Sequence, residues 1–248
     1  MKQPRWVRAL RSRARVTTPI DWSERPPKEA WQASIDGEVR FWEDWLATKG
    51  GRWPGDYETR LDPDLPLQPE FADLIQADPG TTVRLLDVGA GPLTFLGRTS
   101  DRWTLEISAV DALGEQYDTI LAAAGIVAPL RTQTCESERL TNLFSADAFD
   151  LVAARNTLDH SYDPIRAIEE MVTVARPGAA LVLVHHRNTA EDEKYHGMHQ
   201  WNFEVANHTL TVWRPGQRSD VSAALGGTAR FETSWIDGTW EHVVFRKA

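Results

Sequence analysis

Two sets of residues in this sequence have the types and the spacing to bind a ligand and to move a proton. The first is a D-x-G-x-G run, Asp87 to Gly91, which follows a short apolar segment. Glycine lets the backbone approach a ligand closely, because no β-carbon intervenes. Asp111 comes 20 residues after Gly91, where a carboxylate can accept two hydrogen bonds from the hydroxyls of a ribose. The pattern differs from the G-x-G-x-x-G fingerprint of dinucleotide-binding proteins, because Thr94 stands at the third glycine position.

The second set consists of imidazoles and carboxylates. Four of the seven histidines lie between His185 and His199, and His160 lies in a polar stretch upstream of them. A histidine near its ordinary pKa suits proton abstraction at neutral pH. His160 is therefore the first candidate for a catalytic base, with His185 or His186 facing it. The alternative for His160 is a structural histidine that caps the helix after it.

The elements that must position these residues alternate between strands and helices. Apolar runs predict five strands, at 83–88, 106–110, 130–134, 149–153 and 180–184, and helical patterns occupy 115–124 and 164–175. We also expect the glycine loop (residues 87–94) to lead into a helix. This order predicts a doubly wound, Rossmann-like α/β fold with a mostly parallel sheet covered on both faces. Runs at 209–213, 231–236 and 242–246 predict antiparallel strands at the C-terminus. Parallel sheets bind ligands beyond the carboxyl ends of their strands, so both sets should meet there.

Two regions precede this fold. Residues 26–80 are predicted to form a helical cover and connector. In this region 26–49 and 70–77 are helices, and the four prolines of 52–69 indicate a connector without helix or strand. Residues 1–25 form a basic tail, for which we weigh a solvated segment against an arm for an anionic partner. Residues 81–248 then form the domain that holds both sets.

The composition excludes several classes of function. The net charge of −9 argues against nucleic acid as the main partner. The single cysteine, Cys135, excludes an internal disulfide framework and fits a reducing cytosol. We find no apolar run that could span a bilayer, and so expect a cytoplasmic protein without a membrane partner. A homo-oligomer and a monomer both remain open.

With these motifs in order, the segment from Arg84 to Val184 resembles the class I methyltransferases, which use S-adenosylmethionine (SAM). The resemblance implies that the glycine loop lies against the methionine moiety, that Asp111 binds the ribose and that Glu136 faces the adenine. It also matches Arg176, Pro177 and Gly178 to a turn before the fifth strand. The cofactor-binding residues that it implies are Asp87, Gly89, Ala90, Gly91, Asp111, Ala112, Glu136, Ser137, Arg155 and Asn156. The alternative is an α/β domain whose glycines only make a turn.

A finer resemblance concerns the acceptor. Asn156 to His160 is similar to the acid-x-x-acid-His stretch of ubiquinone-pathway O-methyltransferases, which use a divalent metal, with Asn156 in place of the first acid. It implies a magnesium ion held by oxygen atoms of Asp159 and Asn156. The alternative is a solvated Asp159 without a metal. The H-x-x-H spacing of His196 and His199 does not predict zinc, because no cysteine partner lies nearby.

The loop from residue 195 to residue 203 combines aromatic rings with amide and imidazole groups, which suits a sugar or polyol. The alternative is a packed hairpin whose polar groups bond with the backbone. The substrate-binding candidates are Tyr195, His196, His199, Gln200, Trp201 and Asn202. Together with residues 156–164, the loop resembles methyltransferases of bacterial, and especially actinobacterial, glycan clusters. We therefore expect O-methylation of a sugar hydroxyl. The alternatives are a methyltransferase for a phenol or secondary metabolite and a SAM-binding protein without catalysis.

Overall fold

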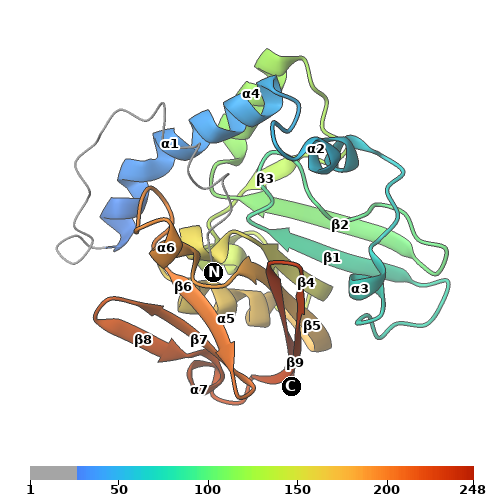
Figure 1. The fold of residues 1–248 in the computed structure, drawn as a ribbon. Helices are drawn as coiled ribbons and strands as arrows, with labels where there is room; N and C mark the ends of the chain where they lie inside the picture. The colour runs from blue at the N-terminus through green and yellow to red at the C-terminus, as the bar shows by residue number, and fades with distance from the viewer. Residues whose placement is uncertain (1–26) are drawn as a thin grey trace.

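The structure, a computed structural model, describes residues 27–248, and the basic tail expected for residues 1–25 lies outside the described residues. A seven-stranded sheet forms the centre of the protein, in the order β3-β2-β1-β4-β5-β10-β9 (Figure 1). Neighbouring strands from β3 to β5 are parallel, whereas β10 and β9 are antiparallel additions. This confirms the predicted fold class. The strands span Thr82–Val88 (β1), Thr104–Asp111 (β2), Thr132–Thr134 (β3), Phe149–Arg155 (β4), Ala175–His186 (β5), Ala229–Asp237 (β9) and Trp240–Lys247 (β10).

Alternate side chains of the central strands enter two different cores. Leu86 and Val152 pack on one face with α5 (Pro164–Val174), whereas Leu85 and Leu151 enter the core on the other face. All four are fully buried. Side chains of a strand point alternately to the two faces of a sheet, so a strand covered on both faces must be apolar throughout. This explains the continuous apolar runs in the sequence.

The second face is covered without a helix after the glycine loop, so that expectation is wrong. Residues 92–103 form turns, bends and an isolated bridge. Their backbone bonds with the proline-rich connector instead: Leu67 N–H donates to the Thr99 carbonyl at 2.8 Å, and Arg98 N–H donates to the Leu65 carbonyl at 2.6 Å. A helix would need these same groups for its own backbone hydrogen bonds.

The N-terminal region contains one helix that the sequence does not predict. Helix α1 spans Pro27–Ala47, close to the expected bounds. Helix α2 (Pro54–Leu61) lies where a connector without helix was expected, and α3 spans only Pro69–Ala72. Pro54 and Pro69 stand in the first turn of these helices, where the missing N–H costs no hydrogen bond. Proline therefore begins two helices in this segment.

Helix α1 lies beside α4 (Gly114–Ala124) at the carboxyl edge of the sheet (Figure 1). The two helices contact each other through Trp42 and Tyr117, whose ring centroids are 6.2 Å apart. Together with Trp45, Leu46 and Leu121, among others, they form a third hydrophobic core. The predicted N-terminal helix thus covers the edge at which the two sets of chemical residues meet.

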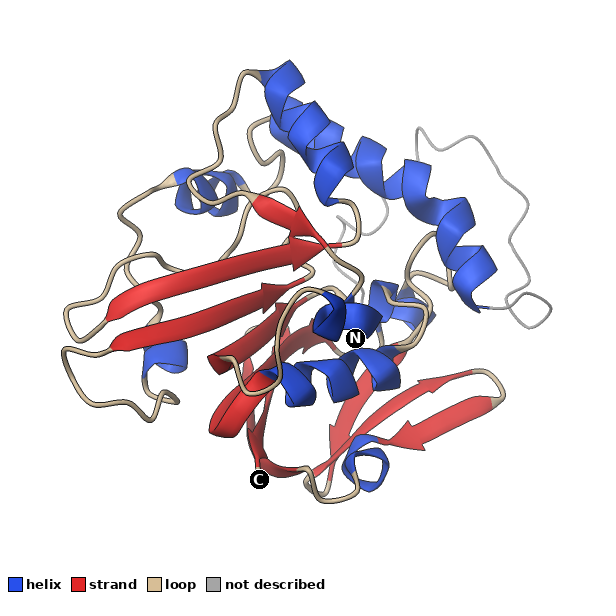
Figure 2. Ribbon diagram, turned by 180° about the vertical axis from the view of Figure 1, so that it is seen from behind, coloured by secondary structure: helices blue, strands red, loops and turns tan. Residues whose placement is uncertain are grey.

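A small antiparallel sheet is inserted between β5 and β9. It consists of β6 (Asn202–Ala206), β7 (Thr209–Arg214) and β8 (Gln217–Asp220), with α6 (Thr189–Asp192) before it and α7 (Val221–Leu225) after it. Figure 2 shows this sheet next to α5, and Phe203 and Val212 join the core around that helix. The sequence predicts β7 but neither of its partners.

Residues 176–178 are part of β5, where the sequence predicts a turn. Phe149 pairs with Ala175 and Leu151 with Ala180, so the extra residues form a bulge in β5. Within the described chain, no helix is both long enough and apolar enough to cross a membrane.

Candidate active site at the carboxyl edge of the sheet

The glycine loop leaves the end of β1 and is held on two sides. The N–H groups of Gly89 and Ala90 donate to the carbonyl of Val110 in β2 at 2.8 and 3.0 Å. On the other side, Arg60 of α2 donates to the carbonyls of Leu93 at 2.5 Å and of Ala90 at 3.3 Å. The loop is therefore fixed in place by a strand and by a half-buried guanidinium.

Both glycines of the loop adopt left-handed backbone angles, with φ +69° at Gly89 and +64° at Gly91. Residues with a side chain rarely adopt these angles. A β-carbon on Gly89 would overlap Thr157, which follows β4, and one on Gly91 would lie 2.7 Å from the ring of Trp42. Neither position tolerates another residue without a local shift.

Asp87 is fully buried near the end of β1. Its Oδ2 accepts a hydrogen bond from the Thr94 hydroxyl at 2.6 Å, whereas its Oδ1 has no partner among the described residues. Burial raises the pKa of Asp87 to about 6, although the Thr94 hydroxyl and Arg60 oppose the rise. A buried oxygen without a partner is a position that a ligand can satisfy.

Asp111 ends β2 beside the loop. Its Oδ2 accepts from Gly91 N–H at 3.1 Å, its Oδ1 accepts from Leu113 N–H at 3.0 Å, and Tyr117 also bonds with it. Burial raises the pKa of Asp111 to about 6. A carboxylate offers about four lone-pair positions, so Asp111 retains capacity for a further donor.

Three titratable side chains converge after β4. Asp159 and His160 belong to the short helix η3 (Leu158–His160), and His199 lies in the loop before β6. Asp159 Oδ2 is 2.7 Å from His199 Nδ1, which is 3.1 Å from His160 Nε2. Asp159 is only 3% exposed. Burial opposes its charge, but His160 and His199 lower the pKa of Asp159 to about 2. Burial likewise opposes charge on His199, yet the hydrogen bond that His199 donates to Asp159 raises the pKa of His199.

Two residues of α1 connect the loop with this cluster. Trp42 packs on Gly91, and its Nε1 donates to Glu38 Oε1 at 2.9 Å. The other carboxylate oxygen of Glu38 lies 3.8 Å from His160 Nδ1. Sequence reasoning finds neither Glu38 nor Arg60, because both act through helices whose approach to the sheet carries no local motif.

Comparison with known proteins identifies the domain. Residues 86–183 match the family model described as the methyltransferase domain. This segment is a methyltransferase domain like those of class I, which use SAM. No curated protein matches the sequence. Among solved structures, a chain from the complex that contains the Haloferax volcanii Trm112 methyltransferase activator is 13% identical, with a TM-score of 0.50. The match covers 83% of this chain and 96% of that chain. A SAM-dependent methyltransferase from Aquifex aeolicus is 14% identical over 77% of this chain and 92% of its own, with a TM-score of 0.45.

SAM is the methyl donor of this class, and the glycine loop fits it. The left-handed glycines leave room for close approach of the backbone, Asp87 Oδ1 lacks a partner, and Asp111 can accept a further hydrogen bond. Ala112 follows Asp111 and is half-buried at the same edge. The methyltransferase therefore brings its predicted donor residues of β1 and β2 together.

The residues predicted to face the adenine form hydrogen bonds and ion pairs with other residues of the chain. Glu136 accepts from the Tyr162 hydroxyl at 2.6 Å and pairs with Arg139 at 3.1 Å and with Lys28 of α1 at 3.6 Å. Ser137, the first residue of the short helix η2 (Ser137–Asn142), donates to a neighbouring carboxylate. Glu136 thus ties α1 to η2, and its contact with adenine stays a prediction.

Arg155 and Asn156 stand at the end of β4, as expected. The Arg155 guanidinium lies 4.9 Å from the ring centroid of Trp240 and 3.6 Å from a carboxylate oxygen of Asp56. Asn156 has φ +52°, and its side-chain oxygen is buried without a partner in the described part of the chain. Like Asp87 Oδ1, this oxygen is available to a ligand.

The loop with the predicted substrate residues is held by hydrogen bonds to residues 159 and 161 and by one hydrogen bond of its own. Gln200 N–H donates to the Asp159 carbonyl, and Trp201 Nε1 donates to the Ser161 carbonyl, both at 3.0 Å. Asn202 donates to the Tyr195 hydroxyl at 3.0 Å. The side chains of Gln200, Trp201 and Asn202 are buried, as in the packed hairpin that we weighed. They position His199, whereas His196 is exposed.

The two histidines at the end of β5 turn toward β10. His185 is buried, and its Nε2 lies 3.3 Å from Glu241 Oε2. His186 donates from Nδ1 to the Thr239 carbonyl at 3.0 Å and stacks on Trp240 at 3.7 Å between ring centroids. The structure gives both rings partners other than His160, so their catalytic role stays a prediction.

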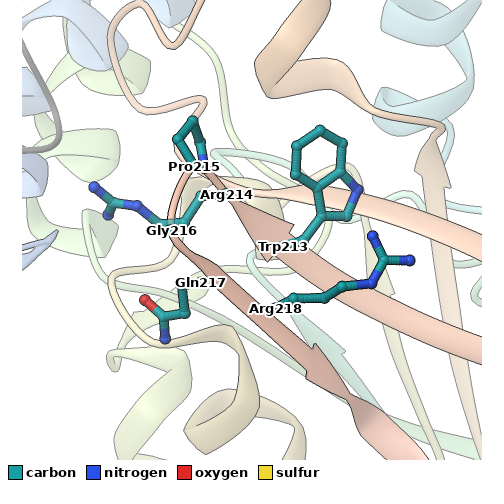
Figure 3. Close-up of a pocket in the computed structure, with 6 residues that line it drawn as sticks. All are labelled: Trp213, Arg214, Pro215, Gly216, Gln217 and Arg218. Carbon is teal, nitrogen blue, oxygen red and sulfur yellow. The ribbon is translucent and has the colours of Figure 1, made fainter.

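A surface hollow of about 400 Å³ lies at the turn between β7 and β8, lined by residues 213–218 (Figure 3). It contains none of the predicted site residues. Arg218 pairs with Glu204 at 2.7 Å, and Trp213 donates to Asn188 at 3.3 Å. The hollow is formed by contacts within the inserted sheet and is separate from the chemistry described above.

Proposed function

We propose that this methyltransferase acts on a hydroxyl oxygen and that its acceptor is a sugar or a related polyol. The position of the Asp159, His160 and His199 cluster carries the proposal. Thr157 lies against Gly89 of the donor loop, and Asp159 follows two residues later. Groups that can take a proton are therefore adjacent to the methyl donor.

The residues of the cluster suit the activation of a hydroxyl. Bound SAM supplies a methyl group on a sulfonium, which the acceptor attacks in line. A hydroxyl is a weak nucleophile until its proton is removed, and a positioned base contributes about a hundredfold or more in rate. His160 takes the proton, while Asp159 orients the neighbouring His199. A divalent ion at Asp159, with Asn156 as a second oxygen ligand, would promote the same proton loss.

The aromatic residues of α1 favour a polar acceptor over a phenol. A pocket for a phenol would use tryptophan faces that are free to contact a ligand. Trp42 instead packs on Trp45 and Tyr117, and Trp31 packs on Tyr162. Half-buried Tyr195 and exposed His196 leave a polar rim in the loop that positions His199, and hydroxyl and imidazole groups suit recognition of a polyol.

Two measurements test the function. Calorimetry with SAM and with its demethylated product should show binding of both, and a radiolabelled-methyl screen should show transfer to sugars. Transfer to phenols alone would support the small-molecule alternative. Binding of SAM without transfer to sugars, phenols or amines would support a non-catalytic protein. No binding at millimolar concentration would overturn the donor site.

A further inference from the structure

The Asp159, His160 and His199 cluster has the geometry of a face of metal ligands. Asp159 Oδ2, His199 Nδ1 and His160 Nε2 lie 2.7, 3.1 and 3.7 Å from one another. The circle through the three atoms has a radius of about 1.9 Å, slightly shorter than the metal–ligand distance of about 2.1 Å for imidazole and carboxylate donors. A point just above the triangle is therefore at bonding distance from all three atoms without movement of any side chain.

Hydrogen bonds alone do not satisfy this arrangement. The single hydrogen on His199 Nδ1 serves Asp159 Oδ2 at 2.7 Å, which leaves His160 Nε2 facing a nitrogen that has already donated. Asp159 Oδ1 has no partner among the described residues, although Asp159 is only 3% exposed. Such an oxygen is costly to bury unless something binds it. One cation would bind Asp159 Oδ2, His199 Nδ1 and His160 Nε2 together, and its charge would stabilise the second oxygen of the same carboxylate.

We propose that Asp159, His160 and His199 bind one divalent transition-metal ion. Two imidazole nitrogens and one carboxylate oxygen are the donor set of zinc, iron and cobalt sites, and such a triad leaves positions open for substrate. Magnesium prefers oxygen ligands alone. The site thus differs from magnesium held by Asp159 and Asn156 both in its third ligand, which comes from the inserted loop, and in its metal.

The surroundings of the cluster match those of a metal centre. A histidine that binds a metal usually directs its other ring nitrogen toward a carboxylate or carbonyl. His160 would bind through Nε2, and its Nδ1 faces Glu38 Oε2 at 3.8 Å. The Trp42 indole orients that carboxylate through the other oxygen at 2.9 Å. The hydrogen bonds from Gln200 and Trp201 to residues 159 and 161 fix the loop that presents His199.

Such an ion gives the cluster a defined role, which rests on the proposed O-methylation. With His160 bound to the ion, the ion rather than this imidazole activates the acceptor. The hydroxyl binds at an open position of the metal, which lowers the pKa of the hydroxyl, and its proton leaves to solvent. The alkoxide oxygen then forms the bond to the methyl carbon, while the sulfur–methyl bond breaks and its electron pair remains on sulfur. Charge and atoms balance without an oxidant or reductant.

Calorimetry of the purified, chelator-treated chain with Zn²⁺, Co²⁺ and Mg²⁺ tests the site without SAM or acceptor. We expect one equivalent of Zn²⁺ or Co²⁺ to bind and Mg²⁺ to bind far more weakly. His199→Gln should lower the affinity for the metal at least about a hundredfold. Loss of a residue that only hydrogen-bonds to a metal ligand already costs about 10- to 100-fold, and His199 is itself a ligand. Glu38→Gln should lower it about tenfold or more. The visible absorption of bound Co²⁺ should change in His199→Gln, which a purely structural role would not produce.

His208→Asn is the matched control, because His208 is an exposed histidine in the turn before β7. It should bind the metal like the unmodified chain. If His199→Gln does not fold, as judged by circular dichroism, His160→Gln tests the other imidazole. Absence of one-equivalent Zn²⁺ or Co²⁺ binding, or equal binding by the ligand variants and the control, would overturn the metal site. The metal-binding result does not depend on SAM binding or methyl transfer, which are measured separately.

Discussion

The proposed donor and acceptor sides of the site are built in opposite ways. On the donor side, Asp87, the glycine loop and Asp111 stand directly at the ends of the strands that position them. On the acceptor side, His199 comes from a loop 39 residues after His160, and Glu38 comes from a helix that precedes the whole sheet. Strand ends fix the first set, whereas tertiary packing assembles the second.

This difference explains why a single domain scaffold can serve many acceptors. A ligand common to all members of a fold can be bound by the ends of the central strands. An acceptor that differs between proteins requires residues from insertions, which change without disturbing the sheet. Here the inserted segment supplies His199 and packs on η3 through Gln200 and Trp201.

The largest expected effect separates the two sides by function. Asp159→Asn and His160→Gln should each lower kcat by about a hundredfold or more, because the acceptor hydroxyl loses its means of deprotonation. The dissociation constant for SAM should stay within about twofold, because neither residue contacts the donor loop. Steady-state kinetics and calorimetry on the same preparations measure both quantities. Near-normal turnover in both variants would mean that alignment with SAM alone drives the reaction.

The contrast also shows how far the sequence could predict the molecule. Asp87, Gly89, Gly91 and Asp111 form a local motif, so their place at the edge of the sheet could be predicted from spacing and periodicity. Asp159 and His160 could also be found, because they follow a strand. The partnership of His160 with His199 could not, since it depends on a loop whose position is set by buried contacts of Trp201.

Two local features misled the prediction of elements. The prolines of 52–69 indicate a connector without helix, although Pro54 occupies the first turn of α2. Glycine after a strand was expected to start a helix, although the connector takes up the backbone groups of residues 98 and 99. Both errors concern which partner a backbone group finds, and tertiary contacts decide that.

The next largest effect concerns the donor side and uses two glycines with similar backbone angles. Gly89 has φ +69° and Gly80 has φ +82°. A β-carbon on Gly80 meets no atom within 4 Å, whereas one on Gly89 overlaps Thr157. Gly80→Ala should lower the free energy of unfolding by about 1 kcal/mol through backbone strain, and Gly89→Ala by about 2–4 kcal/mol because steric overlap adds to it. Urea denaturation of both variants measures the difference. Equal losses would show that Thr157 yields freely and that the donor loop is less constrained than its contacts imply.

Asp87 offers a pH-dependent test of the same loop. Its pKa is raised to about 6 by burial, above the value of about 3.9 in an unfolded chain. The folded state therefore holds the proton more tightly, so the contribution of Asp87 to stability is present below about pH 4 and is lost as pH rises through 6. Asp87→Asn should remove that loss. The variant should exceed the unmodified chain by about 2–3 kcal/mol at pH 7 and match it near pH 4.

Urea denaturation between pH 4 and pH 8 follows this difference, with Asp78→Asn as the exposed control outside the loop. Calorimetry should show weaker SAM binding by Asp87→Asn, because an amide NH₂ donor would stand where the Oδ1 acceptor is available to the ligand. A constant offset between the two chains at every pH would show that Asp87 is not the group that titrates.

The smallest expected effect returns to the acceptor side and asks whether its loop is held as firmly as the donor loop. Trp201→Phe keeps the aromatic core but removes the 3.0 Å hydrogen bond to the Ser161 carbonyl. We expect the free energy of unfolding to fall by about 1 kcal/mol, the net value of one buried hydrogen bond. We also expect kcat to fall several-fold at unchanged SAM affinity, because His199 loses its fixed position relative to Asp159. Trp213→Phe is the control, since it removes a longer bond of 3.3 Å on the half-buried face of the inserted sheet. It should lower stability less and leave kcat unchanged. An equal change in kcat in both variants would place the effect in the inserted sheet as a whole rather than in the contact that presents His199.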